Sequence, residues 1–177
     1  MKINLHKVSI AYSWFVRTLT YFMPNHPFFM RFRGWLYSLM MRSCGRNFQV
    51  ASDVIFNSLS GISVGRNVYI APGNVFICSE LNVGNDVIFG PNSVFSGGNH
   101  QFDGASFRWL PSKSKGVIRI GSGSWVAANC CIVTGGALPE RSVLAAGSVL
   151  NKDMLDDNSI YAGMPARKIG TVKCEAA

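Results

Sequence analysis

Three histidines are the side chains of this sequence best suited to move a proton near neutral pH. His6 and His26 lie in the N-terminal segment, whereas His100 stands in FSGGNHQFDG, where a regular pattern of the chain is interrupted. A histidine at such an interruption could act as a general base and take the proton of a poor nucleophile such as a hydroxyl. On position alone, a surface-loop histidine without a role is an equally good interpretation.

Basic residues near the C-terminus are a second group with possible chemistry. Lys152 lies in LNKD, and Arg167 and Lys168 lie in AGMPARKI. Cationic side chains bind phosphate groups through charge-assisted hydrogen bonds, so these residues could hold a phosphorylated ligand. The alternative is ordinary solvated charge.

A repeat of six residues indicates the elements that position these side chains. From Ile120 the chain reads IGSGSW, VAANCC, IVTGGA, LPERSV, LAAGSV and LNKDM, and VGRNVY and VGNDVI precede it. Val, Ile, Leu or Phe occupies the first position, and the second is usually small. A helix would need a period of 3.6 and a simple strand a period of two. The pattern therefore predicts a solenoid whose coils have three six-residue sides, with first positions inside and Gly or Asn at the corners.

The repeat also divides the chain. Residues 1–43 are predicted to form a helical arm of one or two helices, broken near Met23-Pro24-Asn25. Residues 44–157 form the solenoid, interrupted by an inserted loop at 99–117, and residues 158–177 leave the repeat as a C-terminal tail. An insertion into an otherwise regular solenoid commonly carries function.

The stretch IGSGSWVAANCCIVTGGALPERSVLAAGSVLNKDMLDDNSIYAGMPARKIG resembles the C-terminal half of hexapeptide-repeat acyltransferases. Within that family it is most similar to the galactoside, maltose, serine and capsule or colanic-acid acetyltransferases, over about residues 44–169. The resemblance implies an all-β solenoid, a left-handed parallel β-helix of hexapeptide repeats, here with an N-terminal helical arm and a protruding loop. It further implies a homotrimer with active sites between subunits, and an O-acetyltransferase that moves an acetyl group from acetyl-CoA to a sugar hydroxyl.

The resemblance also implies roles for individual residues. His100 matches the catalytic histidine, which would act as the general base in a direct transfer. Trp125 matches a tryptophan that makes apolar contact near the pantetheine and acetyl end of the donor. Ala128 and Ala146 match positions whose backbone N–H groups bind pantetheine.

Donor phosphates would be bound by Lys152, Arg167 and Lys168 on the last coil and the tail. Asn151 stands where the family commonly has a threonine, which weakens any hydroxyl contact at that position.

Acceptor contacts are less clear from the resemblance. Galactoside-type relatives have an asparagine where this sequence has Ala71, so the acceptor is expected to bind differently. Glu80, Asn99 and Asp103 are candidates to contact a sugar hydroxyl, and either carboxylate could orient His100. The alternative for both carboxylates is an ordinary surface position.

The net charge of +8 is concentrated in the N-terminal segment, where seven basic residues precede Asp53, the first acidic one. They are Lys2, Lys7, Arg17, Arg31, Arg33, Arg42 and Arg46. Aromatic residues lie between them, so this arm could contact an anionic membrane surface. The alternative is that the aromatics pack against the body or another subunit. A nucleic-acid partner is not expected, because no recognition motif accompanies the charge.

Composition fits one folded domain, with 177 residues, 48% hydrophobic and 15% charged. Charged residues and Pro24 interrupt every apolar stretch that approaches a membrane span, and the N-terminus lacks the pattern of a secretory signal. The five cysteines lack zinc-ribbon or CxxC spacing and are expected to be reduced thiols in a cytoplasmic protein. A position at the inner face of the membrane is the alternative location.

This fold is compatible with other functions. A carbonic-anhydrase-like branch needs three histidines on a metal, and the repeat region has only His100, so no metal is expected. A non-catalytic scaffold or regulatory subunit and an acyltransferase for an amino sugar or small antibiotic remain open. Acyl-carrier protein is an alternative donor, although the AGMPAR tail favours coenzyme A. The expected acceptor is a cell-surface polysaccharide or its lipid-linked precursor.

Overall fold

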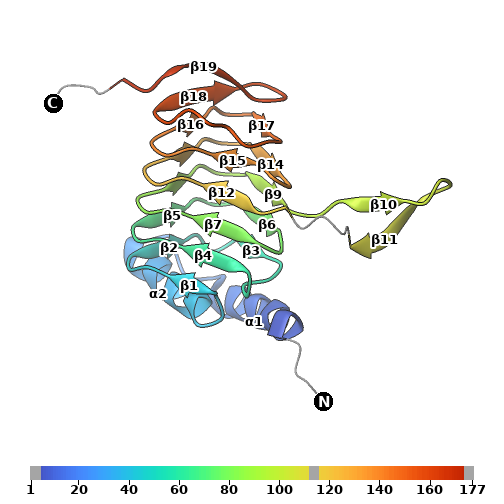
Figure 1. Ribbon diagram of the computed structural model, residues 1–177. Helices are drawn as coiled ribbons and strands as arrows, with labels where there is room; N and C mark the ends of the chain where they lie inside the picture. Colours follow the sequence, from blue (N-terminus) through green and yellow to red (C-terminus); the bar gives the residue numbers. More distant parts are fainter. Residues whose placement is uncertain (1–4, 112–115, 174–177) are drawn as a thin grey trace.

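The computed structural model describes residues 5–111 and 116–173 and is a three-sided parallel β-solenoid standing on two helices (Figure 1). Cys174 and residues 112–115 of the inserted loop lie outside this range. Within the described residues the parallel strands form three sheets, here called A, B and C. Sheet A contains β1 (Ser43–Cys44), β4 (Ile62–Val64), β7 (Leu81–Val83), β12 (Ile118–Ile120) and β15 (Ala137–Leu138). Sheet B contains β2 (Phe48–Val50), β5 (Val68–Ile70), β8 (Ile88–Phe89), β13 (Trp125–Val126), β16 (Val143–Leu144), β18 (Ser159–Ala162) and β19 (Arg167–Thr171). Sheet C contains β3 (Ile55–Phe56), β6 (Val75–Ile77), β9 (Val94–Ser96), β14 (Cys131–Val133) and β17 (Val149–Leu150).

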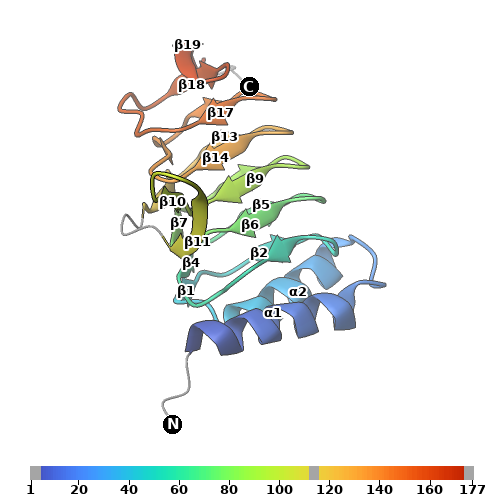
Figure 2. The ribbon, with the colours of Figure 1, turned by 90° about the vertical axis from the view of Figure 1, so that its right-hand side faces the viewer.

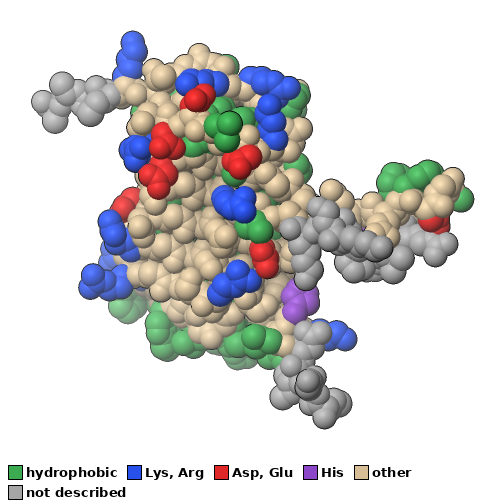
Figure 3. Space-filling view, viewed as in Figure 1, with side chains coloured by type: hydrophobic (Ala, Val, Ile, Leu, Met, Phe, Trp, Pro, Cys, Tyr) green, Lys and Arg blue, Asp and Glu red, His purple; other side chains and the backbone are tan. Residues whose placement is uncertain are grey.

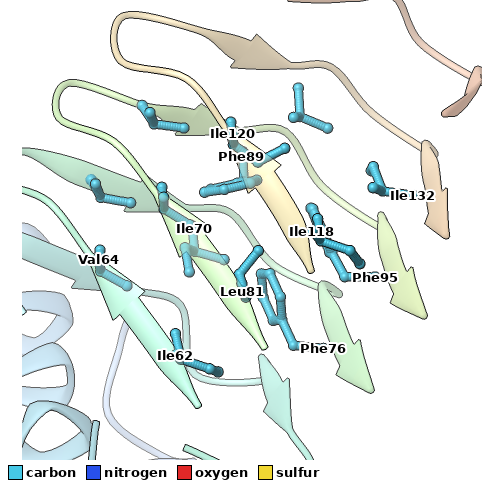
Figure 4. Packing of buried hydrophobic residues seen from close by; sticks show 14 of the residues in the cluster. Ile62, Val64, Ile70, Phe76, Leu81, Phe89, Phe95, Ile118, Ile120 and Ile132 are labelled. Carbon is cyan, nitrogen blue, oxygen red and sulfur yellow. The ribbon is translucent and has the colours of Figure 1, made fainter. Parts of the chain in front are cut away.

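The core is a set of inner columns, because alternate residues of each short strand point inward. The first residue of each six-residue unit in the second half of the repeat is buried, as the repeat predicts. These residues are Ile120, Val126, Ile132, Leu138, Leu144 and Leu150. Figure 4 shows buried side chains of successive coils packed against one another, among them Ile120 and Ile132. Three aromatic rings form one column inside sheet C: Phe76 stacks between Phe56 and Phe95, at centroid distances of 4.9 and 4.4 Å.

Corners between sheets need left-handed backbone, which Asn, Asp and Gly tolerate best. The corner between sheets A and B has positive φ at Asn47, Asn67, Asp86, Gly123, Arg141 and Asn158. Asp86 and Arg141 are the exceptions to the predicted Gly or Asn, and of the two only Arg141 is a residue type that seldom adopts this conformation. Its guanidinium donates hydrogen bonds to Asn158 and Asp157, which helps to hold this turn.

A hairpin leaves the solenoid at the corner between sheets C and A, within the inserted loop. Its strands are β10 (His100–Phe102) and β11 (Phe107–Pro111), which pair antiparallel. Figure 1 shows the hairpin projecting sideways from the coils, and in Figure 2 it points toward the viewer. The exposed rings of Phe102 and Phe107 lie 5.2 Å apart on it.

Two helices cover the first coil, α1 (Leu5–Thr20) and α2 (Pro27–Ser38) (Figure 2). His26 caps the N-terminus of α2, where its Nδ1 accepts a hydrogen bond from the Phe28 amide. Gly34 lets α2 approach β2 closely, because a Cβ there would clash with the Phe48 carbonyl. Among the described residues, no helix is long and apolar enough to cross a bilayer.

A fully buried arginine ties the helices to the solenoid. The Arg33 guanidinium donates hydrogen bonds to the carbonyl oxygens of Thr20, Met23 and Val50 and to the Thr20 hydroxyl. These contacts join the end of α1, the interhelical turn and β2. Arg33, which sequence analysis counts among the arm's charges, therefore contributes nothing to the surface.

Residues after Asn158 begin with another strand of the solenoid, although the sequence predicts a tail that leaves the repeat. β18 pairs in parallel with β16, and β19 folds back antiparallel onto β18. The Ser159 amide donates to Ser142 Oγ, as the Ser142 amide donates to Ser124 Oγ one coil below. β19 is the last strand of sheet B, at the end farthest from the helices.

Candidate functional site

His100 is exposed at the point where the hairpin leaves the coil, at the corner between sheets C and A. The inward-facing Phe95 of β9 is buried in the core, and the chain leaves the corner four residues later at Asn99. The imidazole is thus carried by the rim of the solenoid and not by its packed interior. Such a position allows a base to reach a hydroxyl of a bound ligand.

Glu80 lies at the same corner, one coil nearer the helices. Leu81 pairs with Ile118, and the Ile118 amide donates to the Glu80 carbonyl, so Glu80 lies below the point where the chain returns from the insertion. The Glu80 carboxylate accepts from Arg42 at 3.3 Å, and both side chains are partly exposed. Glu80 is therefore at the corner from which the segment with Asn99 and His100 leaves the solenoid.

Asp103 lies further out, in the turn of the hairpin. Its Oδ1 accepts from the backbone N–H groups of Ala105 and Ser106, at 3.0 and 2.9 Å. A short-range turn of this kind is a common structural use of aspartate. Shaping the hairpin accounts for these contacts of Asp103.

Trp125 lies on another side of the prism. It stands on β13 with its side chain on the outer face of sheet B, 48% exposed. The corner that carries His100 joins sheets C and A and is therefore opposite sheet B. Within one chain the structure does not bring Trp125 and His100 together.

Ala128 and Ala146 occupy equivalent places on the corner between sheets B and C. Continuing the strand register places them directly above Pro72 and Pro91 of the lower coils. Proline has no N–H to offer, whereas among the described residues the Ala128 and Ala146 amides donate no internal hydrogen bond. The upper half of this corner thus presents two free N–H groups that the lower half lacks.

The basic candidates are divided between two corners. Lys152 is exposed in the turn after β17, on the same corner as His100. Arg167 begins β19, directly after the turn that continues the column of Ala128 and Ala146. Lys168 forms an ion pair with Asp156 at 3.2 Å, so part of its charge is already compensated.

The cysteines are free thiols at all four described positions. Burial raises the pKa of Cys78 to about 12 and that of Cys44 to about 11, and it also raises the pKa of Cys130. These three thiols stay protonated near neutral pH and are poor nucleophiles. Cys131 faces outward on β14.

A groove of about 540 Å³ lies along the outer side of sheet A, bordered in part by Asn82, Arg119 and Asp153. None of the predicted site residues lines it. The candidate site therefore consists of residues at the corners and on sheet B.

Sequence reasoning missed the change from proline to alanine along the B–C corner. The signal is present in the units IAPGNV, FGPNSV, VAANCC and LAAGSV, whose third residues are Pro72, Pro91, Ala128 and Ala146. Recognising it requires knowing that this third position lies on a corner. Periodicity alone could not reveal that the N–H group at this third position makes no hydrogen bond to the neighbouring coil.

The chain is similar to known acetyltransferases in sequence and in structure. The chain is 31% identical over 156 residues to galactoside O-acetyltransferase of Escherichia coli (strain K12), a match covering 86% of this chain and 75% of the relative. The structure of a maltose O-acetyltransferase from Clostridium difficile 630 is similar with a TM-score of 0.80 at 20% identity, covering 94% of this chain and 88% of that one. A galactoside acetyltransferase in complex with coenzyme A gives a TM-score of 0.78 at 23% identity, covering 98% and 84%. No profile of a known protein family matches the chain.

These similarities confirm the predicted fold, the left-handed parallel β-helix of the hexapeptide-repeat class. Within that class, the chain belongs to the family of galactoside O-acetyltransferase, the sugar O-acetyltransferase branch. The protein is therefore an acetyltransferase, as the resemblance of its repeats implies.

Proposed function

We propose that this protein transfers the acetyl group of acetyl-CoA to a hydroxyl of a sugar, with His100 as the general base. The observation that carries the proposal is the place of His100, exposed at the corner where the insertion leaves the coil. It is supported by membership of a sugar O-acetyltransferase family. A purified sample incubated with acetyl-CoA and a panel of sugars, amino sugars and an aminoglycoside should release free coenzyme A with O-acetylated sugar as the product.

The chemistry requires one base and a suitably held donor. His100 takes the proton of the acceptor hydroxyl while that oxygen attacks the thioester carbonyl. The C–O bond forms, the C–S bond breaks, and the electron pair of the broken bond leaves with sulfur. The proton held by the imidazole can then neutralise the departing thiolate.

Transfer is direct in this proposal, through a complex that contains donor and acceptor together. A covalent relay would need a reactive thiol or an activated hydroxyl. Cys78 and Cys130 are buried with raised pKa values, which argues against them as relays. Initial rates should therefore follow a sequential pattern and not a ping-pong one.

The donor is proposed to lie along the B–C corner. Successive coils are spaced by about 4.8 Å, so the N–H groups of Ala128 and Ala146 form a short row below Arg167. An extended pantetheine arm offers amide oxygens to such a row, and the donor phosphates suit Arg167 and Lys168 next to it. Lys152 lies on the C–A corner and would reach these phosphates only from a second subunit.

Replacing Ala146 by proline tests this placement. Proline already occupies the equivalent corner at Pro72 and Pro91, so the fold and melting temperature should be unchanged. Loss of one hydrogen-bond donor should weaken coenzyme A binding by about three- to tenfold in calorimetry. The matched control is Pro91→Ala, which adds an N–H to a lower coil and should leave affinity as it is. An Ala146→Pro variant with parental affinity would remove this amide from the donor groove.

A homotrimer with composite sites is the proposed assembly. His100 and Trp125 lie on opposite sides of one chain, so a site containing both needs a second subunit. The outer columns of sheets B and C are apolar, and that of sheet A is polar. Sheet B shows Tyr69, Ile88, Trp125, Val143 and Ile160, sheet C shows Ile55, Val75, Val94, Cys131 and Val149, and sheet A shows Ser63, Asn82 and Arg119.

Light scattering should give the mass of three 19.3 kDa chains. Ile88→Glu places a charge in the apolar column of sheet B and should dissociate the assembly with loss of activity. Asn82→Glu makes the same change on polar sheet A and should preserve the trimer. A stable monomeric parent that still turns over acetyl-CoA would contradict the composite site.

The acceptor is proposed to be a sugar of a cell-surface polysaccharide or of its precursor, acetylated in the cytoplasm. Ala71 is buried where galactoside-type relatives have an asparagine, so Glu80, Asn99 and Asp103 are the proposed acceptor contacts. Mass spectrometry of surface glycans from cells with and without the gene should show one acetyl group gained per repeat unit. Unchanged glycans combined with turnover of a small sugar would point to a free acceptor.

The competing function is a non-catalytic scaffold of the same fold. Titration calorimetry with coenzyme A distinguishes the two, because a scaffold has no need of the free amides and cations on the B–C corner. Measurable binding that Ala146→Pro weakens supports the transferase.

A further inference from the structure

Helix α1 has its polar and apolar sides reversed relative to an ordinary surface helix. It buries Ser9, Ser13, Val16 and Thr20 against the first coil, at spacings of three and four residues. The buried hydroxyls are satisfied, since Ser13 donates to the Phe56 carbonyl and Ser9 contacts Ser58.

The exposed surface of α1 is largely apolar. Val8, Phe15 and Leu19 follow one another at helical spacing along one flank of the buried stripe, and Phe15 and Leu19 are 54% and 57% exposed. A helix of a soluble monomer normally turns such a stripe toward its core. The exposed apolar surface of α1 is therefore suited to contact a partner outside the chain.

Helix α2 repeats the reversal. Its buried side contains Arg33 and Gly34, together with Met30 and Tyr37. Its outer side carries Phe28, Phe32, Trp35 and Leu39, spaced at four, three and four residues and all exposed. Phe32 and Trp35 stack on each other with their centroids 6.0 Å apart.

The two outer sides together form the base of the molecule, which we define by Val8, Trp14, Phe15, Leu19, Phe22, Phe28, Phe32, Trp35 and Leu39. In Figure 3 hydrophobic side chains gather at this end, below the lowest coil. The same end carries Lys7, Arg17, Arg31 and Arg46, and no acidic residue precedes Asp53 in the sequence. An apolar surface rich in aromatics and with cations around it has the chemistry of a bilayer interface.

We infer that the base is a docking surface for an anionic phospholipid membrane, on which the solenoid stands with its helices at the level of the head groups. Trp and Phe side chains would enter the boundary between head groups and acyl chains, and the cations would meet lipid phosphates. A second copy docked base to base would bring like charges together without any carboxylate from these helices to pair them. The inference is independent of the proposed acetyl transfer.

Sedimentation with lipid vesicles tests the inference on the full-length protein. Vesicles of phosphatidylcholine with about 30% phosphatidylglycerol should bind the parent at least tenfold more tightly than phosphatidylcholine alone, because each cation near an anionic surface adds a several-fold preference. Phe15→Gln with Leu19→Gln should reduce binding by about tenfold or more through lost apolar burial. Lys7→Glu should weaken binding to anionic vesicles by about tenfold.

Controls come from the far end of the solenoid. Leu155, 87% exposed, and Lys173 offer the matched changes Leu155→Gln and Lys173→Glu, which should leave vesicle binding unchanged. The changed base residues are exposed, so the melting temperature should stay at the parental value in all variants.

A parent that fails to bind anionic vesicles would overturn the inference. The inference would also fail if the base variants and the control variants at the far end lost vesicle binding equally. Loss of assembly mass in Phe15→Gln with Leu19→Gln, measured by light scattering without lipid, would instead identify a second copy as the occupant.

Discussion

Replacing His100 by alanine is expected to remove most of the acetyl transfer while leaving the fold and donor affinity nearly intact. The side chain is exposed where β10 begins, outside the core columns, so its loss should not disturb packing. Loss of a general base typically lowers the rate by about 10²–10⁴-fold.

The measurement is turnover of acetyl-CoA on a proven acceptor, combined with calorimetry of coenzyme A. His26→Asn is the matched control: it removes a histidine distant from the site and retains a side chain that caps α2 well. Full activity in that variant excludes a general effect of losing a histidine. If His100→Ala kept more than about a tenth of parental activity, against the expected loss, the base would have to be sought at Glu80 or Asp103.

Replacing Phe76 by alanine is expected to cost about 3–5 kcal/mol of unfolding free energy. Phe76 is fully buried on β6, and its ring lies between those of Phe56 and Phe95, one coil below and one above. Its removal deletes the ring that stacks on both Phe56 and Phe95. It leaves a cavity between coils whose backbones are held in place by the ladder of hydrogen bonds. Such a loss is a large part of the stability of a domain of this size.

Urea denaturation at fixed protein concentration measures this loss, because assembly makes apparent stability depend on concentration. Leu155→Ala is the control, since its side chain is largely exposed and should change the unfolding free energy by less than about 0.5 kcal/mol. A Phe76→Ala protein that unfolds at the parental urea concentration would show that the coils collapse around the gap.

The repeat contained most of the information about the solenoid. First positions such as Val126 and Ile132 predicted buried columns, and Asn and Gly predicted left-handed corners. This works because each coil contacts mainly its neighbours, so local pattern and global packing coincide. The prediction was less successful after Asn158, where the hexapeptide pattern fades although β18 still pairs with β16.

The candidate site was predictable only as a set of residues. His100 was identifiable because it stands where the period breaks, and Trp125 and Arg167 through resemblance. That His100 and Trp125 lie on opposite sides of one chain depends on counting sides around a coil, which the residue types alone do not reveal. The surroundings of Asp103 were equally hidden, since its carboxylate accepts from amides that only the folded hairpin brings near.

The two helices show most clearly what the sequence determines and what the tertiary structure determines. By itself the sequence determined that residues before Asp53 are basic and aromatic, and that they form helices interrupted near Pro24. It could not say which side of each helix meets the solenoid, because both a polar and an apolar side were available for burial. In the tertiary structure the side with Arg33 and the serines is buried. Carbonyl oxygens of the first coil and of the interhelical turn accept hydrogen bonds from these side chains, and an apolar side would leave those oxygens without a partner.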